Sequence, residues 1–324
     1  MRNGRTGLAR DVAAGGRLVD TLNVSSKLKV AVLIAGILTA HVFVCAQQQD
    51  PAWRPAIQTA ARIAPQARIV VVRISDGHQV ASRHLEEAAR TLAAPGSTLK
   101  PIVLYQMLTA GMWSADQRVP CSGDLEIGGR RLACSHPSAR PFNAQEALAW
   151  SCNTYFAQAA RAVVPSKLPQ MLQTPGLLAQ TGLTSGEATA EFRAPRTTEE
   201  AQLTVLGVDG IRVTPLELAA AYRWLARELE ANAGSVAART VRGGLAKTAT
   251  FGIAKGATAL GASVMGKTGT AEGADSPQTH GWFVGLTPAL TPEFVVVVYL
   301  PVGHGADAAA VAGEVLAHAP VERK

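Results

Sequence analysis

The stretch "ASVMGKTGTA", residues 262–271, is followed by "HGWFVGLTP" (280–288) and "EFVVVVYL" (293–300). These short runs are rich in apolar and β-branched residues and are separated by turn-forming residues, which predicts three successive strands. A final helix is expected over about residues 307–318. The C-terminal part of the chain therefore supplies most of a sheet.

Further strands are predicted at the other end of the sequence, where residues 67–84 read as a hairpin around "SDG". Helices are predicted between the two groups of strands. "NAQEALAW" has Asn143 and Glu146 as a capping box, and "TPLELAAAYRWLARELE" has Thr214 and Glu217 in the same relation. Strands at both ends with helices between them predict an α/β domain whose central, mainly antiparallel sheet is flanked by helices.

The first 46 residues have a different composition. Residues 1–29 hold six basic and two acidic residues, a net charge of +4, and residues 30–46 ("VAVLIAGILTAHVFVCA") have no charged residue. This pattern predicts a cytoplasmic basic segment and one transmembrane helix. Residues 47–65 would then be a linker and first helix, with the body outside the inner membrane. A cleaved signal remains open, because "VCA" before Gln47 fits a cleavage site.

The formal charge of the whole chain is +7, and more than half of it lies in the N-terminal basic segment. The remaining basic residues are scattered and form no run with interleaved aromatic residues. Nucleic acid is therefore not an expected partner.

Cys121 and Cys134 lie in the glycine-rich stretch "CSGDLEIGGRRLAC". Outside the cytoplasm they could form a disulfide, worth about 3 kcal/mol in the chain-entropy model, or remain two thiols. Zinc bound by these cysteines and His136 is a third alternative. No second closely spaced ligand pair is visible in the sequence, so we expect no metal and no cofactor.

Residues 93–101 read "AAPGSTLKP", with Ser97 and Lys100 one helical turn apart. The same spacing occurs at Ser26 and Lys29 in "SSKLKV". This spacing alone therefore does not distinguish a nucleophile from an ordinary helix start. In "AWSCNTYF", residues 149–156, a serine and an asparagine are equally consistent with a helix N-cap and turn.

The predicted strand "GKTGTAEG", residues 266–273, combines a lysine, a glycine and two threonines. Glycine within a strand often marks the close approach of a ligand or another backbone. Lys267 would supply positive charge, and Thr268 and Thr270 would supply hydroxyl groups for a peptide that ends in a carboxylate. The alternative is a surface strand with a hairpin glycine.

Taken together, the motifs occur in the order S-x-x-K (from Ser97), S-x-N (Ser151 and Asn153) and K-T-G (from Lys267). This set is found in penicillin-binding proteins and class A β-lactamases. The sequence resembles the transpeptidase domain of penicillin-binding proteins, nearest to class B, over residues 66–320. "GVDGIRVTPLELAAAYRWLA" and "THGWFVGLTP" add to the resemblance.

The resemblance implies that Ser97 is the nucleophile and that Lys100 is its base, with a pKa lowered by burial or by Lys267. The acyl donor would be a D-Ala-D-Ala stem peptide of peptidoglycan. Ser151 would relay the proton, and Asn153 would hold the substrate amide.

Three further binding roles are implied by the same resemblance. Backbone N–H groups of Ser97 and Thr270 would form the oxyanion hole, and Thr268, Gly269 and Thr270 would bind the terminal carboxylate. β-Lactams are expected to acylate the same serine.

Other functions within this fold remain open. A D,D-carboxypeptidase differs only in the acceptor. A β-lactamase is less expected, because "EEAQLTV" with Glu199 and Glu200 does not match E-x-x-L-N. A β-lactam sensor is also less expected, since its metalloprotease motif is missing. Only about twenty residues lie between the apolar segment and the domain, where the resembled family usually carries a large module that docks partners. Docking of other cell-wall synthesis proteins therefore stays an open expectation.

Overall fold

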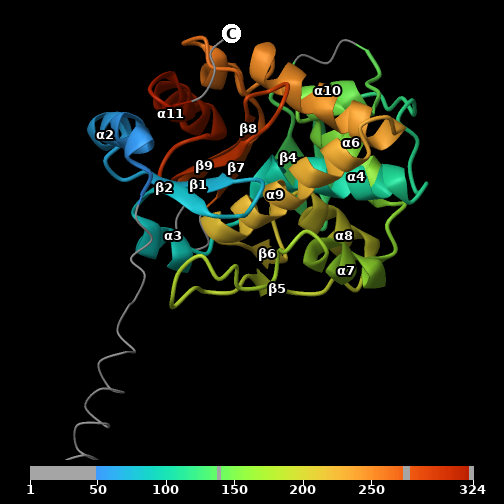
Figure 1. The fold of residues 1–324 in the computed structure, drawn as a ribbon. Helices are drawn as coiled ribbons and strands as arrows, with labels where there is room; N and C mark the ends of the chain where they lie inside the picture. The colour runs from blue at the N-terminus through green and yellow to red at the C-terminus, as the bar shows by residue number, and fades with distance from the viewer. Residues whose placement is uncertain (1–48, 137–139, 273–277, 321–324) are drawn as a thin grey trace, which may run out of the picture. The chain divides into compact units, whose positions relative to one another are not determined.

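A five-stranded sheet forms the centre of the computed structural model, in which residues 49–136, 140–272 and 278–320 are described (Figure 1). The strands lie in the order β2–β1–β9–β8–β7, and every neighbouring pair is antiparallel, as predicted. Their bounds are β1 Arg68–Arg73, β2 Gln79–Arg83, β7 Met265–Glu272, β8 Thr279–Thr287 and β9 Phe294–Leu300.

The two ends of the described chain meet in the middle of this sheet. β1 pairs with β9 along its whole length, from Arg68 opposite Tyr299 to Arg73 opposite Phe294. The predicted N-terminal hairpin and the three C-terminal strands are therefore confirmed and form one sheet. β7 lies at its edge, with β8 as its strand neighbour.

Alternate residues of β9 belong to two separate hydrophobic cores, one on each face of the sheet. Val295 and Val297 pack into the larger core, and Val296 and Val298 into the smaller one. Burial on both faces explains why this strand is a continuous apolar run rather than an alternating one.

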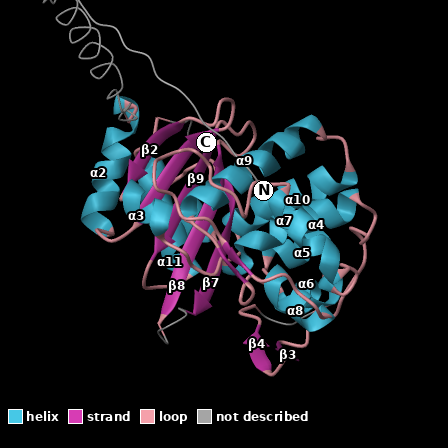
Figure 2. Ribbon diagram, turned by 90° about the horizontal axis from the view of Figure 1, so that it is seen from below, coloured by secondary structure: helices cyan, strands magenta, loops and turns pink. Residues whose placement is uncertain are grey.

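Helices cover both faces (Figure 2). α2 and α11 pack on the smaller core, while α4, α9 and α10 pack on the larger one. The α-helices are α2 Arg54–Ile63, α3 Leu85–Arg90, α4 Lys100–Thr109, α5 Ala144–Ala149, α6 Asn153–Ala160, α7 Leu168–Gln173, α8 Thr198–Val205, α9 Pro215–Ala231, α10 Val236–Thr250 and α11 Gly305–Ala317.

The predicted helix starts are confirmed where a local signal marks them. Asn143 and Glu146 form a capping box at α5, and Thr214 and Glu217 form one at α9. Four short strands form two antiparallel pairs away from the central sheet: the hairpin of β3 Asp124–Ile127 with β4 Arg130–Ala133, and β5 Glu191–Phe192 with β6 Ile211–Arg212.

The predicted basic segment (1–29) and transmembrane helix (30–46) lie outside the described residues. Within the described part of the chain, no helix is both long enough and apolar enough to cross a membrane.

Candidate active site

Ser97 lies in a 3-10 turn, η2 (Gly96–Leu99), that leads directly into α4, whose first residue is Lys100. Two contacts from distant segments hold this turn. The buried Tyr222 hydroxyl of α9 donates to Thr98 O at 2.8 Å, and Gly96 N donates to Gly207 O at 2.9 Å. The helix start is thus also a fixed platform for the Ser97 side chain.

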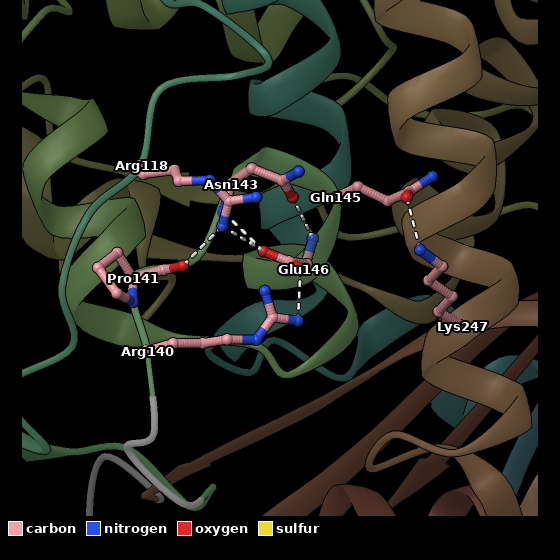
Figure 3. A network of polar contacts seen from close by, with 7 residues as sticks. All are labelled: Arg118, Arg140, Pro141, Asn143, Gln145, Glu146 and Lys247. Atoms are coloured by element: carbon pink, nitrogen blue, oxygen red, sulfur yellow. Dashed lines mark hydrogen bonds and ion pairs between the residues drawn. The ribbon is translucent and has the colours of Figure 1, made fainter.

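A polar network anchors α5, the helix that precedes Ser151 (Figure 3). Asn143 Oδ1 accepts from Glu146 N at 3.0 Å, and Glu146 Oε2 accepts from Asn143 N at 3.1 Å. The Glu146 carboxylate also pairs with Arg118 at 3.3 Å and with Arg140 at 2.6 Å. These contacts fix the start of α5 to two neighbouring loop segments.

The other side of α5 is joined to α10, because Lys247 Nζ donates to Gln145 Oε1 at 2.6 Å. Ser151 follows in the short connection between α5 and α6, with a left-handed backbone (φ 57°). That conformation is uncommon for a serine and is found disproportionately at functional sites. Ser151 is buried, and Asn153 begins α6.

β7 brings the third motif against the Ser97 turn. Lys267 Nζ donates to Ser151 Oγ at 2.8 Å and to Thr268 O at 3.0 Å. A Cβ atom on Gly269 would lie 2.4 Å from Pro95 O, so only glycine allows this approach. The predicted meaning of this glycine is confirmed, and the approaching backbone is that of the turn preceding Ser97.

Lys100 and Lys267 are both fully buried and converge on Ser151. Lys100 Nζ donates to Ser151 O at 2.8 Å and to Asn153 Oδ1 at 2.6 Å, and it lies 3.4 Å from Ser151 Oγ. Burial lowers the pKa of Lys100 to about 8, against the opposing effect of nearby cysteines. Burial, and then the charge of Lys100, lowers the pKa of Lys267 well below its usual value.

A cavity of about 420 Å³ opens onto this arrangement. Five of the predicted site residues line it: Ser97, Ser151, Asn153, Thr268 and Thr270. The structure therefore brings the three motifs together, although Lys100 and Ser151 are 51 positions apart in the sequence and Ser151 and Lys267 are 116 apart. Two serine hydroxyls and two buried lysine amines beside one cavity are groups of the kind that acyl transfer through a serine requires.

Sequence reasoning missed the remaining walls of the cavity. Ala133 is the last residue of β4 and Ser135 lies two residues later, Ile253 follows α10, and His304 and Ala306 flank the start of α11. These residues have no motif of their own, and only the fold places them here.

Two side chains have contacts that refine the expected roles. Asn153 Oδ1 accepts from Lys100, and its Nδ2 donates to Ala133 O at 2.7 Å. Asn153 thus orients the lysine as well as lining the cavity. Thr270 Oγ1 accepts from Gly305 N at 2.9 Å, so its hydroxyl hydrogen points away from the N-terminus of α11.

A Cys121–Cys134 disulfide was one of the alternatives that the sequence left open, and the structure shows no disulfide at either residue. Cys134 Sγ lies 4.0 Å from Cys152 Sγ, and Cys121 Sγ lies 3.8 Å from His136 Nε2. The hairpin β3–β4 directs the two thiols toward α6 and His136. The spacing of the cysteines in the sequence could not indicate this arrangement.

Comparison with known proteins agrees with this geometry. The family model "Penicillin binding protein transpeptidase domain" matches residues 69–319. The chain belongs to this penicillin-binding transpeptidase family. Its members are acyl-transferase enzymes, and the resemblance seen in the sequence is confirmed. A comparison with curated protein sequences found no match.

Solved structures share the fold of this penicillin-binding transpeptidase domain at low sequence identity. A peptidoglycan glycosyltransferase from Burkholderia ambifaria has a TM-score of 0.73 and 19% identity, covering 84% of this chain and 95% of its own. The transpeptidase domain of Burkholderia pseudomallei penicillin-binding protein 3 has a TM-score of 0.70 and 21% identity, and the match covers 82% of this chain and 92% of its own. The D,D-transpeptidase domain of an Eggerthella lenta peptidoglycan glycosyltransferase has a TM-score of 0.69 and 22% identity, and the match covers 82% of this chain and 80% of its own.

Proposed function

We propose that this protein is a peptidoglycan D,D-transpeptidase that works through an acyl-enzyme on Ser97 and is acylated by β-lactams. The observation that carries the proposal is the convergence of the buried amines of Lys100 and Lys267 on Ser151, beside the cavity that Ser97 lines. A serine hydroxyl is a weak nucleophile unless a neighbouring base removes its proton, and a lysine with a lowered pKa is such a base.

In the proposed reaction, Ser97 Oγ attacks the carbonyl carbon of the penultimate D-alanine while neutral Lys100 accepts the hydroxyl proton. The tetrahedral oxyanion would be held by the backbone N–H groups of Ser97 and Thr270. The backbone next to Ser97 lies close to Thr270: a Cβ added at Gly96, the residue before Ser97, would lie 3.0 Å from Thr270 N. This closeness supports a shared oxyanion hole.

Collapse of the intermediate breaks the C–N bond to the terminal D-alanine. Its nitrogen receives, through Ser151, the proton that Lys100 accepted from Ser97. Lys267 donates to the Ser151 hydroxyl and supplies positive charge near it. The substrate carboxylate would bind to the hydroxyls of Thr268 and Thr270 at the cavity wall. The amine of a second stem peptide then attacks the ester and regenerates Ser97.

Labelling with a fluorescent penicillin tests the nucleophile. We expect the full-length protein to become covalently labelled and Ser97→Ala to remain unlabelled. Ser26→Ala is the matched control, since Ser26 has the same spacing to a lysine and should leave labelling unchanged. Labelling of the Ser97→Ala variant would contradict the proposal.

The acyl acceptor needs a separate experiment. A donor stem peptide is supplied with and without an acceptor amine, and the products are identified by mass spectrometry. A cross-linked product supports the transpeptidase, whereas release of D-alanine with water alone indicates a carboxypeptidase. Rapid turnover of penicillin instead of stable labelling would indicate a β-lactamase.

We also propose that residues 30–46 anchor the domain in the inner membrane with residues 1–29 in the cytoplasm. The support is the sequence, an uncharged run preceded by basic residues. The full-length protein should remain in the membrane fraction after alkaline carbonate washing, while a variant starting at residue 47 should not. Recovery of a chain shortened at the N-terminus would identify a cleaved signal instead.

A further inference from the structure

Three of the four cysteines of the chain gather around one histidine next to the active site. The cluster consists of Cys121 before β3, Cys134 after β4, His136 two residues later and Cys152 at the N-cap of α6. Their four potential ligand atoms all lie within 4.8 Å of one another. We call this group the Cys3His cluster; the fourth cysteine, Cys45, lies outside the described residues.

The distances within the Cys3His cluster match a tetrahedral metal site. With Zn–S bonds of about 2.3 Å and Zn–N bonds of about 2.0 Å, neighbouring ligand atoms of a tetrahedron are separated by about 3.6–3.8 Å. The separation is 4.0 Å between the sulfurs of Cys134 and Cys152, and 3.8 Å between Cys121 Sγ and His136 Nε2. A disulfide needs sulfurs about 2.05 Å apart, so these separations correspond to neighbouring ligands rather than to a bond.

Each sulfur of the cluster also accepts a backbone N–H group. Such donors favour the thiolate, which is the form that binds a metal, and they orient the sulfur. The donors are Gly123 N to Cys121 Sγ at 3.4 Å, Asn153 N to Cys134 Sγ at 3.2 Å and Tyr155 N to Cys152 Sγ at 3.5 Å.

We propose that the Cys3His cluster binds one zinc ion as a structural site. Three thiolates and one imidazole form a closed set of four protein ligands with the softness that zinc prefers, and they leave no position for substrate. The sequence argument against zinc was that no second closely spaced ligand pair is visible beside Cys121, Cys134 and His136. The fold overturns it by supplying Cys152, 18 positions after Cys134.

The position of Cys152 gives the site a role in the enzyme. It lies between Ser151 and Asn153, so a metal there would tie the second active-site motif to the β3–β4 hairpin. Asn153 already contacts that hairpin through Ala133 O, and Ala133 and Ser135 line the cavity. Zinc would therefore be a positioning element for the relay serine and for one wall of the cavity, without contact to the reacting atoms.

The decisive measurement is the metal content of the full-length protein. It is produced in zinc-supplemented medium with an affinity tag that contains no histidine, freed of loose metal by buffer exchange and analysed by mass spectrometry of the elements. We expect one zinc per chain. Replacement by Co²⁺ should give the visible bands of tetrahedral cobalt together with thiolate-to-cobalt charge transfer.

Variants separate this site from adventitious binding. Cys152→Ser should reduce the zinc content from one per chain to near zero, whereas the control Cys45→Ser should keep one. Because Cys152→Ser removes a buried group and could fail to fold, the wild-type metal content and cobalt spectrum remain the primary readouts. Wild-type protein without zinc, with iron or copper in its place, or with a disulfide among these cysteines would overturn the proposal.

A kinetic readout tests the positioning role. Removal of zinc from the wild-type protein by a chelator should slow acylation by penicillin, and added zinc should restore the rate. An unchanged rate would rule out that role. Metal content does not depend on the serine chemistry, so failure of the Ser97 experiment and failure of the zinc site can be told apart.

Discussion

Lys100 is the residue whose protonation state controls the proposed chemistry. It is held by Ser151 and Asn153 in a fully buried position, and burial lowers its pKa to about 8. A base with a pKa near the working pH combines a substantial neutral fraction with useful basicity. The same burial that stabilises the neutral amine therefore suits Lys100 to the role of base that we propose for it.

The pH dependence of acylation follows from this shift. Below pH 8 the amine is mostly protonated and cannot accept a proton, so the rate of acylation should rise as the pH rises through about 8 and then level off. Lys100→Arg keeps a positive charge that cannot be removed and should lower the rate by about 10²- to 10⁴-fold. Stopped-flow acylation between pH 6 and 10 measures both effects. A rate independent of pH over this range would exclude Lys100 as the base.

At the scale of elements, the active site depends on how closely β7 packs against the Ser97 turn. Gly269→Ala would place a Cβ 2.4 Å from Pro95 O, and a backbone oxygen cannot move away without displacing the turn. We expect a loss of about 1–3 kcal/mol in the free energy of unfolding, together with slower acylation. Gly234→Ala is the control, because among the described residues no heavy atom beyond its chain neighbours lies within 4 Å of the added Cβ. Equal urea midpoints and labelling rates for the two variants would contradict this account.

The network around α5 allows a second prediction at this scale. Asn143→Ala removes the N-cap acceptor and should cost about 1 kcal/mol in urea unfolding. Glu146→Gln keeps a capping side chain but removes the partner of Arg118 and Arg140, which are both more than half exposed, and should cost about 0.2–1 kcal/mol. The reverse order of the two losses would show that the ion pairs, rather than the cap, hold α5.

At the scale of the whole molecule, the sequence predicted what local signals encode. The hairpin at 67–84, the three C-terminal strands and the capping boxes depend on neighbouring residues, and the structure confirms them. The candidate active-site residues were selected because three short motifs occur in a specific order. No local pattern showed that Cys152 lies beside Cys134 or that His304 lines the cavity, because these contacts arise from long-range packing.

The pairing of β1 with β9 has a consequence for how the enzyme becomes active. Arg73 pairs with Phe294, 221 positions later, so a ribosome must synthesise nearly the whole domain before the sheet can close. Closing so long a loop costs entropy before the strand contacts compensate for it, which slows folding. The Ser97 turn emerges early, but β7 is joined to β1 only through β8 and β9. We therefore expect β7 to be held against the turn only after these two strands have paired. A nascent chain that stops at residue 292 should therefore not react with penicillin, and newly made enzyme should become a target only after its last strand has folded.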